Sequence, residues 1–75
     1  MSKLPALKPR EVLRILEKAG YHTDHISGSH YIMRHPDRAG RVVVPFHGNS
    51  DLKVGILQTI IKQSGLTTEE FLALR

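Results

Sequence analysis

Apolar residues recur at helical spacing near both ends of the chain, and the middle of the chain is patterned differently. After a basic arm over residues 1–8, Pro9 has the fixed φ and the missing N–H that the first position of a helix tolerates. Gly20 supplies a C-terminal stop. The apolar positions between them are Val12, Leu13, Leu16 and Ala19. This spacing predicts a helix over about residues 9–19.

Residues 21–47 are typical of strands rather than helices. Residues 31–33 (Tyr-Ile-Met) and 42–44 (Val-Val-Val) are rich in β-forming side chains, and residues 36–40 between them have turn chemistry. Residues 21–27 are a weaker strand candidate. Together these segments predict a meander of three antiparallel strands.

Residues 52–64 carry a second helical stripe, which ends at the glycine that follows. Its apolar positions are Leu52, Ile56, Leu57, Ile60 and Ile61. Residues 49–51 (Asn-Ser-Asp) offer N-terminal caps for this helix. Thr67 and Glu70 have the spacing of a capping box, which predicts a last short helix over about residues 68–74.

The predicted order of elements is α-β-β-β-α with a C-terminal helical turn, so the fold class is α+β. We expect one two-layer domain over residues 1–75, with an antiparallel three-stranded sheet and both helices on one of its faces. Val12 and Leu16 of the first helix should pack on that face beside Ile56 and Ile60 of the second. The opposite face is then open to water or to a partner.

Composition narrows the class of partner. Eleven Lys and Arg against seven Asp and Glu give a net charge of +4, which suits nucleic acid or an acidic protein. The absence of cysteine excludes disulfides and thiolate-rich zinc sites. No stretch approaches the roughly 20 apolar residues that span a bilayer, and the first residues lack the apolar run of a signal peptide. We therefore expect a soluble, cytoplasmic protein with no membrane association.

The five histidines are numerous for a chain of this length, but their spacing argues against a metal site. His22 and His25 lie three apart in a predicted strand, where an odd spacing sends side chains to opposite faces. His30 and His35 fail as a pair for the same reason. With no cysteine and no clustered carboxylates, the sequence predicts no metal and no cofactor.

The triplet Gly28-Ser29-His30 opens the second predicted strand. Alternation places Tyr31 and Met33 on the core face, so that His30 and Arg34 point to the open face. A histidine titrates near neutral pH and is a candidate general base or acid, and the glycine lets a ligand approach the backbone. On this pattern alone, an ordinary surface histidine explains His30 better.

Three segments taken together resemble the HicA (YcfA-like) family of toxin mRNA interferases: LPALKPREVLRILEKAGY, GSHYIMRH and VVVPFHGNSDLKVGILQTIIKQSGLTTEEFLAL. The Gly-Ser-His triplet, the Val-Pro-x-His segment and the Gly-Ile-Leu helix occur in the family's order and at its spacing. The resemblance runs from about Leu4 to Leu74, nearly the whole chain.

The resemblance implies a fold like a double-stranded-RNA-binding domain and ribosome-independent, metal-free cleavage of mRNA by the toxin of a type II toxin–antitoxin system. It also implies a HicB-type antitoxin that covers the active site on the open sheet face. The family's catalytic histidine maps onto His30, with Gly28 and Ser29 as its supporting residues. Many members have a second histidine where this chain has Tyr31. Because that position faces inward, the change should affect packing more than chemistry.

Basic residues outside the triplet are candidates for contacts with RNA phosphates, which give affinity but little sequence reading. We assign this role to Arg34 and Arg41, which flank the predicted hairpin, and to Lys53. The wider set of basic candidates also includes Lys3, Lys8, Arg10 and Arg38. For any one of them, a solvated surface position is the alternative.

The hairpin predicts a second histidine at the site. An even loop centred on Arg38-Ala39 pairs Met33 with Val44, Tyr31 with Phe46, and His30 with His47. His47 is then a candidate second catalytic or phosphate-binding residue. A loop of odd length with Gly40 as a bulge would separate the two histidines, and His47 would merely end the strand.

Two rival functions use the same fold. One is a non-catalytic RNA-binding module, in which replacing His30 changes affinity rather than product. The other is a protein-interaction domain with Ile32 and Val43 as an apolar docking patch on the open face. Incubation with labelled RNA in EDTA separates an enzyme from a binding module.

Overall fold

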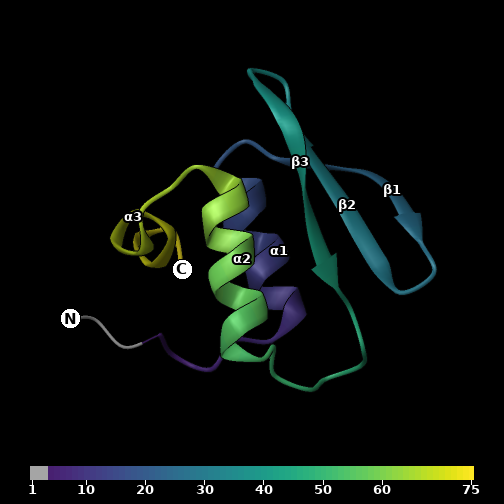
Figure 1. Cartoon of the computed structure of the whole chain (residues 1–75), viewed down its shortest axis with the longest axis vertical. Helices are drawn as coiled ribbons and strands as arrows, with labels where there is room; N and C mark the ends of the chain where they lie inside the picture. Colours follow the sequence, from purple (N-terminus) through teal and green to yellow (C-terminus); the bar gives the residue numbers. More distant parts are fainter. Residues whose placement is uncertain (1–3) are drawn as a thin grey trace.

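The computed structural model describes residues 4–75 and has the predicted order of elements, α-β-β-β-α with a short final helix. The elements are α1 (Pro9–Lys18), β1 (His22–Ser27), β2 (His30–His35), β3 (Arg38–Pro45), α2 (Val54–Ser64) and α3 (Thr68–Ala73). In Figure 1 α2 overlaps α1 and the sheet lies next to both helices, which makes a small α+β domain. Of the predicted basic arm, Lys3 and the residues before it lie outside the described residues.

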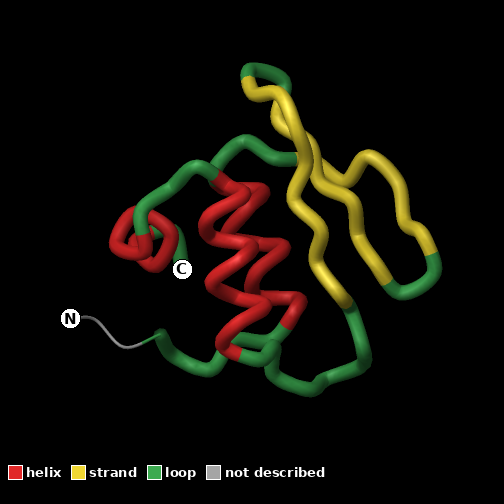
Figure 2. Tube along the Cα trace, viewed as in Figure 1, coloured by secondary structure: helices red, strands yellow, loops and turns green. Residues whose placement is uncertain are grey.

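The three strands form one antiparallel sheet in the order β1-β2-β3, as the meander predicted. The helices pack on one side of this sheet, and α3 lies on the far side of the helices (Figure 2). The core between the layers takes Met33, Val42 and Val44 from the sheet. The helices bury Val12, Ile15, Leu16, Leu57, Ile60, Ile61 and Phe71 against them.

The first and last helices have local signals that the structure uses. Pro9 opens α1, and the Glu11 carboxylate accepts a hydrogen bond from the Lys8 N–H at 3.1 Å. In α3 the capping box forms as predicted: the Glu70 N–H donates to Thr67 Oγ1 at 3.0 Å, and the Thr67 N–H donates to the Glu70 carboxylate at 2.8 Å. Each bond satisfies a backbone donor that the first turn of a helix leaves without a partner.

The second helix begins later and packs differently from the prediction. It starts at Val54 with Lys53 at the N-cap position, so the predicted caps at residues 49–51 lie in the preceding loop. Ile56 is 38% exposed, whereas the next residue, Leu57, is 1% exposed and belongs to the core. Ile56 is therefore not the core residue that we expected, because the predicted stripe was wider than the face that α2 buries. Gly65 ends the helix with a φ of 78°, as expected of a C-terminal glycine.

The hairpin prediction was wrong by two residues. The turn is Pro36-Asp37, not Arg38-Ala39, and Met33 pairs with Val42 rather than with Val44. Likewise Tyr31 pairs with Val44 and His30 with Pro45. Since the displacement is even, every side chain stays on its predicted face.

A contact outside the hairpin explains where the chain turns. The Asp37 N–H donates to His35 Nδ1 at 3.0 Å, which leaves Nε2 of that ring to donate to the Ala19 carbonyl at 3.2 Å. The ring also packs against Tyr21, with 5.1 Å between centroids. These contacts fix the turn against the end of α1, and an irregularity between Met33 and His35 absorbs the extra residues of β3.

Candidate active site on the open sheet face

His30 is exposed at the first position of β2, on the face away from the helices. Gly28 in the preceding turn has a φ of 59°, a conformation that costs glycine little and other residues more. The Ser29 carbonyl accepts a hydrogen bond from the Phe46 N–H at 2.7 Å. The two residues therefore form the turn and tie it to the end of β3, which fixes the backbone that carries His30.

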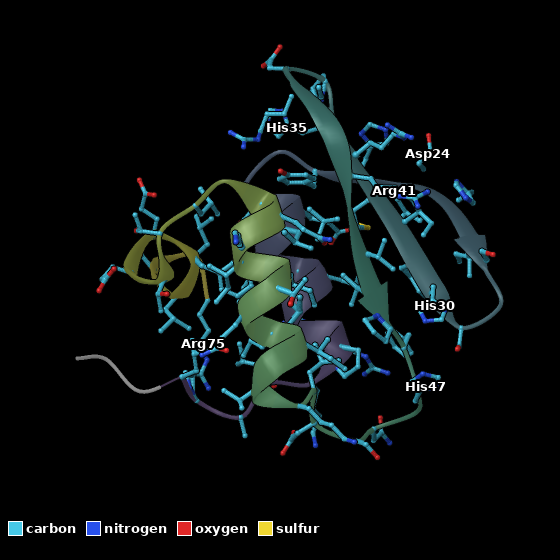
Figure 3. All side chains as sticks on the ribbon, in the orientation of Figure 1. Asp24, His30, His35, Arg41, His47 and Arg75 are labelled. Atoms are coloured by element: carbon cyan, nitrogen blue, oxygen red, sulfur yellow. The ribbon has the colours of Figure 1, made fainter. Side chains whose placement is uncertain are left out.

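His47 lies against His30 although the two residues are not paired in the sheet. Their rings meet edge to face, with centroids 6.2 Å apart and an interplanar angle of 85°. The backbone partner of His30 is Pro45, and His47 comes from the loop that follows β3. The expected proximity is therefore present, but the expected register is not. Figure 3 shows both histidines at the same end of the sheet.

Tyr31 occupies the position at which many members of the resembled family have a second histidine. It is partly buried and packs against the core, and its ring lies 5.1 Å from the ring of Phe46. Its position is that of a packing residue, as the alternation of side chains predicted. Ile32, on the other face, is only 5% exposed, and Val43 is half-buried. The predicted apolar docking patch thus offers little exposed surface.

Sequence analysis did not predict a second polar cluster on this face, which consists of His22, Asp24, His25 and Arg34. A bulge in β1 between Thr23 and His25 makes His22 pair with Arg34, and His25 with Ile32. Both histidines therefore share the open face, and the expectation that they point to opposite faces was wrong. An extra residue in one strand is enough to reverse alternation. Aspartate is depleted in regular strands, so Asp24 within the predicted strand was the sequence feature that could have indicated this bulge.

Asp24 links His25 to Arg34 within this cluster. Its carboxylate lies 2.7 Å from His25 Nδ1 and 3.9 Å from Arg34 Nε. The hydrogen bond from His25, aided by the charges of His25 and Arg34, holds the pKa of Asp24 below its ordinary value. Arg34 therefore faces a carboxylate, which offsets part of the charge that we expected it to offer to RNA.

Arg41 is the freer of the two predicted arginines. It precedes Val42, which is buried in the core, so alternation puts Arg41 on the open face. Among residues 4–75 no hydrogen bond or ion pair engages its side chain. In Figure 3 Arg41 lies near Asp24 and is closer than His30 to the turn between β2 and β3.

The other basic candidates divide into exposed and structural positions. Lys53 is exposed at the N-cap of α2, where the helix dipole adds positive potential. The Arg38 guanidinium occupies the space that a Cβ on Gly65 would need, at the C-terminal end of α2. Lys8 Nζ donates to the Asn49 carbonyl at 3.0 Å. Arg38 and Lys8 thus have contacts within the fold.

Two hollows adjoin this region. The first, of about 350 Å³, lies beside His47, and its other lining residues are Pro9, Pro45, Ser50, Asp51, Leu52, Lys53 and Ile56. The second, of about 510 Å³, lies between β3 and α2 and is lined mainly by Val43, Pro45, Ile56, Thr59, Ile60 and Gln63. They share Pro45, Lys53 and Ile56, so the surface is grooved from His47 along α2.

Comparison with known proteins gives a family. A sequence model described as the HicA toxin of bacterial toxin–antitoxin matches residues 9–66, well over half of the chain. A search of curated proteins finds no match. Within residues 4–75, no helix has the length and apolar character to cross a membrane. The match covers α1, the whole sheet and α2, and the chain belongs to the HicA family of toxins from bacterial toxin–antitoxin systems.

Proposed function

We propose that this protein is the toxin of a type II pair and acts as a metal-independent endoribonuclease that cleaves mRNA. The observation that carries the proposal is the contact between His30 and His47, whose ring centroids lie 6.2 Å apart on an exposed surface. Two imidazoles at this spacing reach one phosphodiester group together. In the proposed mechanism His30 is the catalytic residue, and His47 is its partner in proton transfer or phosphate binding.

The proposed reaction needs only groups that the chain and the RNA supply. The ribose 2′-oxygen attacks the adjacent phosphorus, the bond from phosphorus to the 5′-oxygen breaks, and a 2′,3′-cyclic phosphate forms. One histidine removes the proton of the 2′-OH, and the other gives a proton to the departing 5′-oxygen. The nucleophile is already tethered beside the phosphorus, so proximity supplies much of the acceleration. Each positioned acid or base adds about 10²–10⁴-fold.

Basic side chains support this reaction by binding the RNA phosphates and by stabilising the negative charge that develops during cleavage. Arg41 on the sheet and Lys53 at the start of α2 are both exposed and lie on elements next to the histidines. A cation near the phosphorane stabilises the negative charge that develops there. Arg34 contributes less in this proposal because it faces Asp24. Gly28 and Ser29 support the site through the backbone turn that presents His30.

The proposed protein partner is a HicB-type antitoxin that covers the open sheet face. The net charge of +4 favours an acidic partner, and opposite charge speeds association and makes it sensitive to salt. Occlusion of His30 then explains neutralisation. A complex in which His30 stayed fully accessible would contradict this part of the proposal.

The experiment that tests the function uses the purified protein with labelled RNA in EDTA, and DNA of the same sequence as the control. We expect cleavage of the RNA to products that end in a cyclic phosphate, and intact DNA, because DNA lacks the 2′-OH. Binding of RNA with no cleavage would instead identify a non-catalytic RNA-binding module.

A further inference from the structure

The hollow beside His47 has walls suited to a flat ring system. Its volume is about 350 Å³, at the lower end of the roughly 300–1,000 Å³ typical of small-ligand pockets. Apolar side chains make up half of its lining: Pro9, Pro45, Leu52 and Ile56. The imidazole of His47 lines it as well, and aromatic rings stack on nucleobases.

The loop over residues 46–53 that forms this hollow is held at three points. The Phe46 N–H donates to the Ser29 carbonyl at 2.7 Å, and the Leu52 N–H donates to the Leu7 carbonyl at 2.9 Å. Between them, Lys8 Nζ donates to the Asn49 carbonyl at 3.0 Å. A loop fixed in this way loses little conformational entropy when a ligand enters, so the hollow is preformed.

Asp51 gives the hollow a chemical preference. Its side chain is 50% exposed, and its Oδ1 lies 3.5 Å from Lys8 Nζ, which orients the carboxylate. A carboxylate offers acceptors only. Guanine presents two adjacent donors, N1–H and the 2-amino group, to such a pair of oxygens. Adenine, cytosine and uracil each set a carbonyl or a ring nitrogen with a lone pair beside their donor, which a carboxylate repels.

We propose that this hollow is a guanine-binding subsite that selects the nucleotide next to the cleaved phosphate. His47 lines the hollow and touches His30, so a base in the hollow leaves its own ribose and phosphate beside the two histidines. Lys53 also lines the hollow, and its ammonium group can pair with the phosphate of the bound nucleotide. This inference rests on the proposed function, since it takes RNA as the ligand, and it adds Asp51 as the specificity-determining residue.

The test measures binding, so that it does not depend on cleavage. The four ribonucleoside 3′-monophosphates are titrated separately into ¹⁵N-labelled protein, and amide shifts are followed. We expect guanosine 3′-monophosphate to shift the amides of residues 50–56 and to bind about tenfold or more tightly than the others, the discrimination typical of a bidentate contact. In Asp51→Asn, which replaces one acceptor by a donor, that preference should disappear.

Asp37→Asn is the matched control, because it makes the same change of carboxylate to amide at an exposed position in the turn between β2 and β3, outside the lining of the hollow. It should retain the preference for guanosine, and the amide spectra of both variants report whether they are folded. Equal binding of the four nucleotides, shifts confined to β1 and β2, or an unchanged preference in folded Asp51→Asn would each overturn the proposal. Selective binding by a protein that cuts no RNA would refute the proposed function and leave the guanine subsite standing.

Discussion

The two ends of β2 each carry a histidine, and the two side chains differ in exposure and in hydrogen bonding. At the hairpin end, both ring nitrogens of His35 are engaged by backbone groups of Ala19 and Asp37, and the ring packs on Tyr21. At the other end, His30 is exposed and touches only another histidine ring among its described aromatic and polar contacts. A histidine with both nitrogens satisfied holds structure together, whereas one with free nitrogens keeps the capacity to move protons.

Replacement of His30 should have the largest effect. In His30→Ala the cleavage rate should fall by about 10²–10⁴-fold, because a general acid or base is lost. The melting temperature should hardly change, since exposed positions usually matter by less than about 0.5 kcal/mol. The matched control is His25→Ala, another exposed histidine of the open face, which should cleave at nearly the normal rate. A folded His30→Ala protein that still cuts RNA would remove the distinction between the two ends of β2.

His47→Ala should lower the rate less, by about 10²-fold, and should also change the pH profile. An acid and a base acting together give a bell-shaped dependence of rate on pH, and the loss of one partner removes one limb. The measurement is the single-turnover rate across pH for wild type and variant. If neither the rate nor the profile changes, His30 acts without His47.

His35→Ala should show the opposite behaviour to His30→Ala. It removes the acceptor for the Asp37 N–H and the donor to the Ala19 carbonyl. We expect a loss of about 1–2 kcal/mol in the free energy of unfolding, measured with denaturant. Cleavage well below the melting temperature should persist. Lost activity in a stable His35→Ala protein would show that the hairpin end also serves the reaction.

The sequence predicts the start of a helix where the residues that fix that start are neighbours along the chain. The helices with local signals, α1 with its proline and α3 with its capping box, have the expected starts. The start of α2 was missed because the polar residues before it belong to a loop tied down by Lys8 and Leu7. Those partners lie far away in the chain, and no local pattern reports them.

The site was predicted in part for a similar reason. The faces of β2 and β3 follow from alternation, which survives an even shift of register, so His30 and Arg41 were placed correctly on the open face. The turn position depends on the bond between His35 and Ala19, which are 16 residues apart. Asp51 was identified only as a possible helix cap, because its position beside a hollow depends on how the loop, α1 and α2 come together.

The smallest expected effect concerns Asp24. Its pKa is lowered in the folded protein from an ordinary value of 3.8, chiefly by the hydrogen bond from His25. A lowered pKa means that the carboxylate stabilises the fold above that value, and that the contribution is lost as pH falls through the folded-state pKa. Asp24→Asn should therefore be slightly less stable than wild type near neutral pH, and the difference should vanish in acid.

Thermal unfolding of wild type and Asp24→Asn from pH 7 to about pH 2 measures this difference. Asp37→Asn is the control, because among residues 4–75 no hydrogen bond or ion pair engages the carboxyl of Asp37. A stability difference for Asp24→Asn that is the same at every pH would show that its contact with His25 contributes nothing through charge.

Histidine-assisted attack by the ribose itself is tested most directly with a chemically altered substrate. A short RNA is prepared with a single 2′-deoxynucleotide on the 5′ side of a mapped cleavage point, and wild-type protein is incubated with it in EDTA. We expect cleavage at that point to stop while cleavage at other points continues, since the nucleophile is missing only there. Continued cleavage at the altered nucleotide would mean that water attacks the phosphorus, and that the pair formed by His30 and His47 does not work by the proposed mechanism.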